Sequence, residues 1–297
     1  MKEILSKNLA SRAARLRIAS ISLSEGIRSG NFRSASRGQG IEFSDVREYI
    51  PGDNVRAIDW NVTARMGRAF IKQYEEDREL NVLVVLDCSR SMFSGSSDGV
   101  RIVSACEVAA LAVLASERNS GASGAVFFDG SVRFSCPPKP GRENALSILS
   151  KIDRLEFPSG AVNGSALSSA LRCASNLLRK RSLVFVVSDF RAAGWEKELA
   201  FLSCRNDVIA VRISDSTDSE LPVVGTVPFS DSETGASAVL PTSSSSFARA
   251  WFEANRRRVD SWEELCAKHG AHTLVVSTAE DSVLALSRFF AKRRSRR

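Results

Sequence analysis

The stretch "NVLVVLDCSRSM" (Asn81–Met92) decides the fold class of this chain. Residues 82–87 form a continuous Val/Leu run that ends in an aspartate. Such runs are typical of parallel β-strands that are covered on both faces. The same pattern predicts four further strands, at 124–128, 183–189, 207–213 and 272–277.

The segments between these runs predict helices, at about 101–118, 142–153, 165–180, 194–203, 247–269 and 279–292. Strands that alternate with helices indicate an α/β fold with a doubly wound, mostly parallel sheet. The pair Asp129-Gly130 separates two apolar runs and is a hairpin signal. We therefore expect residues 131–135 to form one antiparallel edge strand.

The composition is that of an ordinary globular protein, with 43% hydrophobic and 25% charged residues in 297. The sequence has no uninterrupted apolar run of membrane-spanning length, and its first 20 residues lack the apolar block of a secretory signal. The six cysteines form no CxxC pair. These features predict a cytoplasmic protein with reduced thiols and no zinc site.

Positive charge is concentrated at the two ends of the chain. The net charge is +7, yet residues 1–40 and 292–297 contain an excess of Lys and Arg that leaves the remainder acidic. Basic ends can contact nucleic acid or an anionic membrane surface, although solvated termini are the commoner explanation. We predict a basic, partly helical arm (1–40), a small β-rich appendage (41–80), the sheet domain (81–290) and a basic tail (291–297).

Polar side chains follow two of the predicted strands. Asp87 ends the first run, with Ser89 and Ser91 at alternate positions after it, and Asp189 ends "LVFVVSD". In open parallel sheets, ligands bind beyond the carboxyl ends of the strands. Two carboxylates at one edge repel each other unless a cation lies between them. Ser165, a predicted helix N-cap, could add a hydroxyl there.

These oxygen ligands, without sulfur or imidazole, suit a hard cation such as Mg²⁺ or Mn²⁺. Taken singly, each residue has a commoner role, because Asp often forms turns and Ser often caps helices. Together, the order Asp-x-Ser-x-Ser, a later hydroxyl and a later Asp resembles the metal-ion-dependent adhesion site of von Willebrand factor A domains. The resemblance implies a set of metal ligands made of Asp87, Ser89, Ser91, Ser165 and Asp189, with Ser165 where that family usually has Thr.

The upstream segment "GIEFSDVREYIPGDNVRAIDWNVTAR" (Gly40–Arg65) closely resembles the signature of domain-of-unknown-function family 58. Proteins of this family are typically encoded beside MoxR-type AAA+ ATPases. The resemblance implies a non-catalytic, metal-dependent interaction module that binds an Asp or Glu of a partner. That partner would be a MoxR-type ATPase or its client, in complex assembly, maturation or stress response. From the residues alone, the charged signature is equally consistent with paired surface charges and with a docking surface.

Three alternative functions are less consistent with the residues. A phosphatase of the haloacid dehalogenase class would use Asp87 as its nucleophile, but it needs a second carboxylate where Ser89 stands. A serine hydrolase needs a histidine, and only His269 and His272 exist, at the start of the last strand. Nucleic-acid binding through the basic ends would need a basic face with aromatic residues, so it is not expected.

Overall fold

The computed structural model describes residues 41–50, 53, 55, 58–76, 81–96, 99–156, 166–230 and 237–295. They belong to two compact units, one within Ser34–Glu79 and one that includes Leu80–Arg297. The predicted arm 1–40 and the last two residues of the predicted tail lie outside the described residues. The predicted domain boundaries stay predictions.

The smaller unit is a two-stranded antiparallel ribbon with a short helix. Strands β1 (Ile41–Glu48) and β2 (Phe70–Glu76) pair with each other, and α2 (Trp60–Met66) lies between them in the chain. Asp59 caps α2 by accepting hydrogen bonds from the first backbone N–H groups of the helix. Gly67, with φ of 67°, ends the helix in the left-handed conformation that favours glycine.

Charged residues of the Gly40–Arg65 signature make local contacts within this unit. Arg47 donates two hydrogen bonds to Asp53, at 2.8 and 2.7 Å, and Asp53 also accepts from the backbone N–H of Ile50. The ion pair therefore fixes the turn after β1. In contrast, Trp60 on α2 is 68% exposed. Arg47 and Asp53 of the signature thus have a structural role, whereas Trp60 exposes apolar surface to solvent.

The larger unit is built on a six-stranded sheet in the order β12-β9-β8-β3-β6-β7. Every neighbouring pair is parallel except β6 and β7, which are antiparallel. This confirms the predicted doubly wound sheet with one antiparallel edge strand. The strands are β3 (Val82–Asp87), β6 (Ser123–Phe128), β7 (Val132–Lys139), β8 (Leu183–Ser188), β9 (Asp207–Ser214) and β12 (His272–Ser277).

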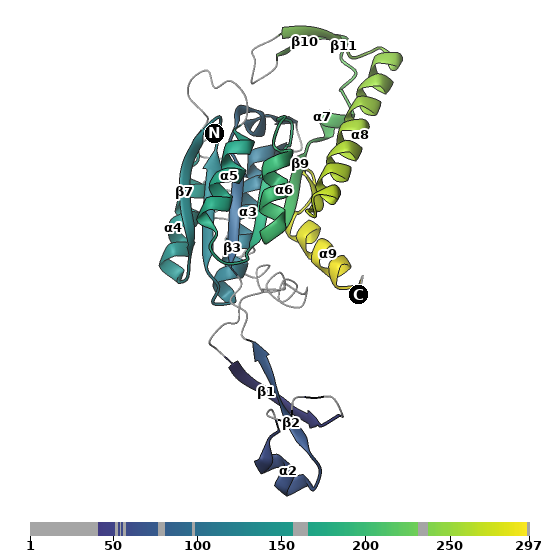
Figure 1. The fold of residues 1–297 in the computed structure, drawn as a ribbon. Coiled ribbons are helices and arrows are strands. Elements are labelled where there is room, and N and C mark those ends of the chain that lie inside the picture. Colours follow the sequence, from purple (N-terminus) through teal and green to yellow (C-terminus); the bar gives the residue numbers. More distant parts are fainter. Residues whose placement is uncertain are drawn as a thin grey trace. The chain divides into compact units, whose positions relative to one another are not determined.

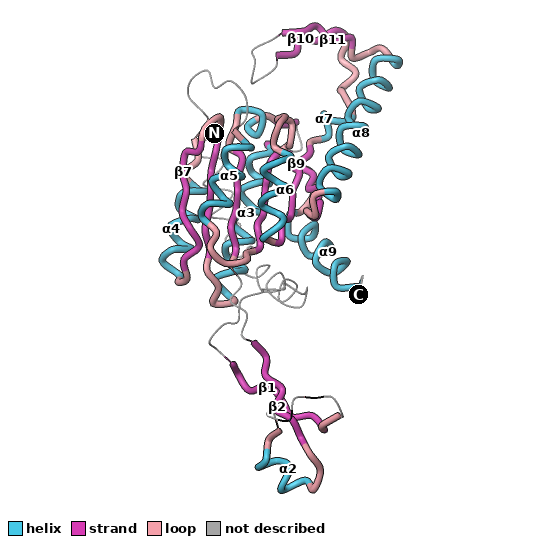
Figure 2. The backbone as a smooth tube through the Cα atoms, in the orientation of Figure 1, coloured by secondary structure: helices cyan, strands magenta, loops and turns pink. Residues whose placement is uncertain are grey.

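Helices cover both faces of this sheet (Figures 1 and 2). Residues of α3, α4 and α9 pack on one face, and residues of α5, α6 and α8 pack on the other. The helices are α3 (Arg101–Arg118), α4 (Arg142–Asp153), α5 (Leu167–Leu177), α6 (Glu196–Arg205), α8 (Ser245–Lys268) and α9 (Ser282–Ser295).

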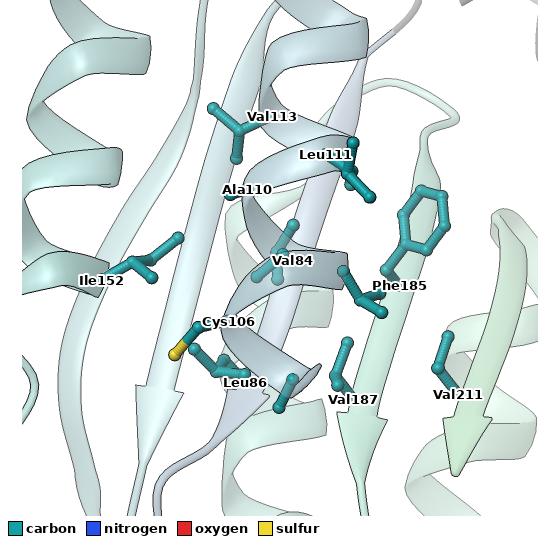
Figure 3. Packing of buried hydrophobic residues seen from close by; sticks show 14 of the residues in the cluster. Val84, Leu86, Cys106, Ala110, Leu111, Val113, Ile152, Phe185, Val187 and Val211 are labelled. Carbon is teal, nitrogen blue, oxygen red and sulfur yellow. The ribbon is translucent and has the colours of Figure 1, made fainter. Parts of the chain in front are cut away.

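The core explains the continuous apolar runs. All six residues of β3 are buried, with alternate side chains entering the two opposite clusters. Figure 3 shows Val84 and Leu86 of β3 packed with Phe185 of β8 beneath Leu111 of α3. Many small residues in α3 allow this helix to be buried almost all round. The strand pattern follows because both faces of the sheet are covered.

One glycine marks a close approach of two strands. A Cβ atom on Gly124 in β6 would lie 2.7 Å from the backbone O of Cys136 and from the backbone N of Pro138 in β7. No real side chain tolerates such contacts without a shift of the backbone. The edge strand β7 can therefore pair here only because position 124 has no side chain.

Several short elements were not predicted. They are the 3₁₀ turn η2 (Arg90–Phe93), strands β4 (Gly95–Ser96) and β5 (Gly99–Val100), helix α7 (Ser216–Ser219) and the hairpin β10 (Thr226–Ser230) with β11 (Ser237–Pro241). The hairpin contacts α8 through Phe229 and Trp251, whose ring centroids are 6.0 Å apart. Within the described residues, no helix combines the length and apolarity needed to cross a membrane.

Candidate metal centre

Two buried aspartates lie at the same edge of the sheet. Asp87 is the last residue of β3, and Asp189 directly follows β8. Because β3 and β8 are parallel neighbours, their carboxyl ends lie side by side. Asp87 is 1% exposed and Asp189 is 3% exposed. The sheet therefore places two carboxylates together, away from bulk water.

The first loop after β3 folds back onto Asp87. The backbone N–H of Ser89 donates to Oδ1 of Asp87 at 2.9 Å, and the hydroxyls of Ser89 and Ser91 are hydrogen-bonded at 3.1 Å. Both serines are buried. The 3₁₀ turn η2 begins at Arg90 and contains Ser91, and it brings the hydroxyl of Ser91 back to that of Ser89.

Ser188, the last residue of β8, links the two strands at the site. Its hydroxyl donates to Oδ2 of Asp87 at 2.6 Å and accepts from the backbone N–H of Phe190 at 3.0 Å. Sequence reasoning missed Ser188 because it lies inside an apparently apolar run. Phe190 has a φ of 53°, rare for a residue with a side chain. Its buried ring packs against Trp195 and Trp262, which holds this backbone in place.

Asp189 has one oxygen that is only partly satisfied. Its Oδ1 accepts from the backbone N–H of Arg191 at 3.1 Å. Its Oδ2 is buried and has no hydrogen-bond donor in the described part of the chain, although Nε of Arg191 lies 3.6 Å away. A buried carboxylate oxygen in this state can accept a further positive partner.

The electrostatics of the two aspartates also favour a bound cation. Burial, followed by the charge of Asp189, raises the pKa of Asp87 to about 7, although hydrogen bonds from Ser188 and Ser89 act against this rise. Two neighbouring carboxylates that are both ionised need a cation to offset their repulsion. The donor set is two carboxylates and two hydroxyls, and such oxygens fit a small hard cation.

The predicted role of Ser165 needs a correction. The residue was expected to cap the helix that begins near it, but α5 begins at Leu167 and its N-cap residue is Ala166, which makes no side-chain capping hydrogen bond. Ser165 itself lies outside the described residues. The structure therefore brings together Asp87, Ser89, Ser91 and Asp189, and leaves the fifth predicted ligand untested.

Other kinds of metal site find no support in the described residues. No group of three or more His, Cys, Asp or Glu side chains there could hold a metal ion. Cys88 lies between Asp87 and Ser89 but is buried, and burial raises its thiol pKa well above the usual value. His272 begins β12, at the opposite end of the strands from Asp87.

A buried ion-pair network adjoins the site. Asp218 in α7 accepts a 2.6 Å hydrogen bond from Nη2 of Arg101, the first residue of α3, and it also pairs with Arg191. Arg101 in turn donates to the hydroxyl of Ser94 at 2.7 Å, in the segment that follows η2. Asp218 therefore ties together three loops at this edge of the sheet, those that follow β3, β8 and β9.

The sheet order, the antiparallel edge strand and the Asp-x-Ser-x-Ser loop at the end of a central strand define a von Willebrand factor A-like protein. The chain belongs to the family described as "Protein of unknown function DUF58", which residues 45–261 match.

Sequence relatives include uncharacterized proteins of Mycobacterium tuberculosis (strain ATCC 25618 / H37Rv) and Mycobacterium bovis. Each is 32% identical over 281 residues, which cover 91% of this chain and 85% of the relative.

Two solved structures are also similar. An aerotolerance-related membrane protein from Bacteroides fragilis gives a TM-score of 0.49 at 17% identity, covering 73% of this chain and all of that one. The SpRpn10 VWA domain gives a TM-score of 0.42 at 12% identity, covering 70% of this chain and 94% of that one.

Proposed function

We propose that this chain is a non-catalytic protein-interaction module whose binding depends on a divalent cation, Mg²⁺ or Mn²⁺. The proposed ligands are Asp87, Ser89, Ser91, Ser165 and Asp189. The observation that carries the proposal is the pair of buried aspartates at neighbouring strand ends, one of which has its pKa raised to about 7. A fold that holds two such carboxylates together favours a cation between them.

A bound cation would supply positive charge and a coordination position that a partner's Asp or Glu could complete. The chain's own residues prepare that position. Ser188 holds the carboxylate of Asp87, and the backbone of Arg191 holds that of Asp189. The Ser89–Ser91 hydroxyl pair keeps neutral oxygens beside them. A carboxylate that arrives here would make a charge-assisted contact in a place from which water is largely excluded.

The absence of catalysis is part of the proposal. A phosphatase that uses Asp87 as a nucleophile needs a proton-transferring carboxylate two residues later, and Ser89 stands there. Oδ2 of Asp87 already accepts a 2.6 Å hydrogen bond from Ser188, and Oδ1 accepts from Ser89. Both oxygens are therefore held as acceptors, which suits a ligand to a cation.

The partner that we propose is a MoxR-type AAA+ ATPase or its client, in the cytoplasm. This part rests on the family resemblance. The apolar residues exposed in the smaller unit, among them Ile50, Trp60 and Met66, offer a second contact surface for such a partner.

A pull-down experiment tests the proposed function. The whole chain serves as bait for the purified ATPase, in Mg²⁺ and in EDTA. We expect recovery only in Mg²⁺, and we expect Asp87→Ala to abolish it. The matched control is Asp260→Ala, which removes a carboxylate that is 57% exposed on α8. Equal recovery in EDTA would show that binding of the ATPase does not depend on a metal ion.

A further inference from the structure

A small basic cavity lies at the opposite edge of the sheet from the candidate metal centre. Its volume is about 90 Å³, and it opens at the ends of α5 and α6, two helices on the same face of the sheet (Figure 1). Arg181 lies just before β8 and Asn206 just before β9, so the cavity is at the amino ends of these strands. The lining consists of four basic residues and four others: Arg179, Lys180, Arg181 and Arg205, with Ser175, Leu178, Phe201 and Asn206.

This cavity has an excess of positive charge, because no carboxylate lines it. The acids that lie nearest to it in the chain are already paired with other cations. Glu198 of α6 pairs with Arg172 of α5. Asp207 of β9 pairs with Arg293 of α9. The three arginines of the cavity form no ion pair within the described part of the chain, and all three are exposed.

The helix ends at the cavity do not neutralise this charge. Basic side chains are favourable near the C-terminus of a helix, and both α5 and α6 end here. Each helix end carries about half a negative elementary charge, so the two ends offset only about one of the three unpaired guanidinium charges. The remaining positive charge attracts anions to this edge of the sheet.

Phe201 distinguishes this cavity from a simple anion site. Its ring is 55% exposed on α6, among the basic side chains. A carboxylate or a free phosphate gains little from an exposed aromatic ring, whereas a nucleobase stacks on it. Guanidinium groups bind phosphate oxygens and also stack on bases. The lining therefore favours a ligand that carries both phosphates and bases.

We propose that this cavity binds single-stranded nucleic acid. A backbone phosphate lies among the guanidinium groups of Arg179, Arg181 and Arg205, and a neighbouring base stacks on the ring of Phe201. The basic ends of the chain are not required. Local sequence could not predict this site, because Arg181 and Arg205 reach one cavity only through the pairing of β8 with β9.

Fluorescence anisotropy tests this site, with the whole chain and a labelled oligothymidylate of about 12 nucleotides in about 0.1 M salt. EDTA is present, so the result does not depend on the proposed metal centre, and Asp87→Ala should bind like the wild type. We expect Arg179→Gln/Arg181→Gln to weaken binding at least about tenfold and to reduce its salt dependence. Phe201→Ala should weaken binding at least about fivefold, because a base loses its stacking partner.

The control variant Arg249→Gln/Arg257→Gln removes the same charge from exposed positions on α8 and should bind like the wild type. Thermal unfolding checks that the variants are folded. Oligouridylate distinguishes RNA from DNA, and tighter binding of either one supports the proposal. Three results would overturn it: no binding by the wild type, an equal loss in the control, or unchanged binding by Phe201→Ala. Tighter binding of a labelled polyglutamate peptide would also overturn it, since the site would then serve an acidic protein.

Discussion

The hydroxyl of Ser188 donates a 2.6 Å hydrogen bond to Oδ2 of Asp87, across the boundary between two parallel strands. This bond joins the two strand ends that carry the aspartates of the candidate metal centre. It also stabilises the ionised form of Asp87 and acts against the rise in pKa that burial causes. The position of Ser188 therefore affects both the stability of the fold and the charge of the site.

Replacement of Ser188 by alanine should destabilise the larger unit by roughly 1–3 kcal/mol, because two buried hydrogen-bonding groups lose their partner. The groups are the carboxylate of Asp87 and the backbone N–H of Phe190. Urea unfolding measures this loss. Ser175→Ala is the control, since that half-buried hydroxyl only donates within its own helix to Leu171, and its effect should be within about 0.5 kcal/mol. Equal losses of stability in the two variants would contradict the structural role that we assign to the Ser188 hydroxyl.

The stability of the metal-free protein should fall as pH rises from about 4 to about 7. The pKa of Asp87 in the fold, about 7, exceeds the usual value of 3.8. The folded state therefore binds this proton more tightly than the unfolded state, and the stabilisation is present at low pH and is lost toward pH 7. Urea unfolding in EDTA at pH 5 and pH 7.5 measures the difference.

The variant Asp87→Asn isolates the contribution of Asp87 to this pH dependence, because an asparagine side chain does not titrate. We expect a smaller loss of stability between pH 5 and pH 7.5 in the variant than in the wild type. At pH 7.5, added Mg²⁺ should restore the stability of the wild type and leave that of the variant unchanged. If the two proteins show the same pH dependence, Asp87 does not titrate in this range.

Replacement of Asp218 by asparagine should destabilise the fold by about 3–5 kcal/mol, because the buried Arg101 loses its carboxylate. The side chains of Arg101 and Asp218 are 4% and 5% exposed. Arg191 is 38% exposed and contributes less, since water screens it. The surface variant Glu198→Gln breaks a pair with an arginine that is 66% exposed and should change stability by less than about 1 kcal/mol. Chemical denaturation compares the two, and similar effects would refute the structural role of Asp218.

Replacement of Gly124 by alanine should destabilise the sheet by about 1–3 kcal/mol, because the new Cβ would meet the backbone of β7 at 2.7 Å. Thermal unfolding measures the effect. A variant as stable as the wild type would show that β7 can shift away from β6 at little cost.

Much of the sheet was predictable because burial on both faces leaves a direct trace in the sequence. Continuous Val, Leu and Phe runs such as 82–87 and 183–188 can satisfy the pattern of a covered parallel strand and little else. The hairpin of β10 and β11 left no such trace. Its residues include Pro228 and Pro241, and those of β11 are mostly exposed, so no continuous apolar run marks these two strands.

The candidate site was predictable only where residues follow strands. Asp87, Ser89, Ser91 and Asp189 all lie at or after the carboxyl ends of β3 and β8. These ends are adjacent because the two strands are parallel neighbours. The burial of Arg212 was not predictable, since one arginine near the end of a strand usually reaches solvent. Its buried position depends on packing beside Trp262 of α8, 50 residues later in the chain. Contacts of such sequence separation are set by packing and not by any local pattern.

We propose that a divalent cation binds where β3 and β8 end. The decisive experiment is calorimetric titration of the whole chain with MgCl₂ at pH 8, where Asp87 is ionised. We expect binding of about one ion per chain, which Asp189→Asn abolishes and the exposed control Asp260→Asn retains. An absence of binding to the wild type, or equal binding to Asp189→Asn, would contradict it.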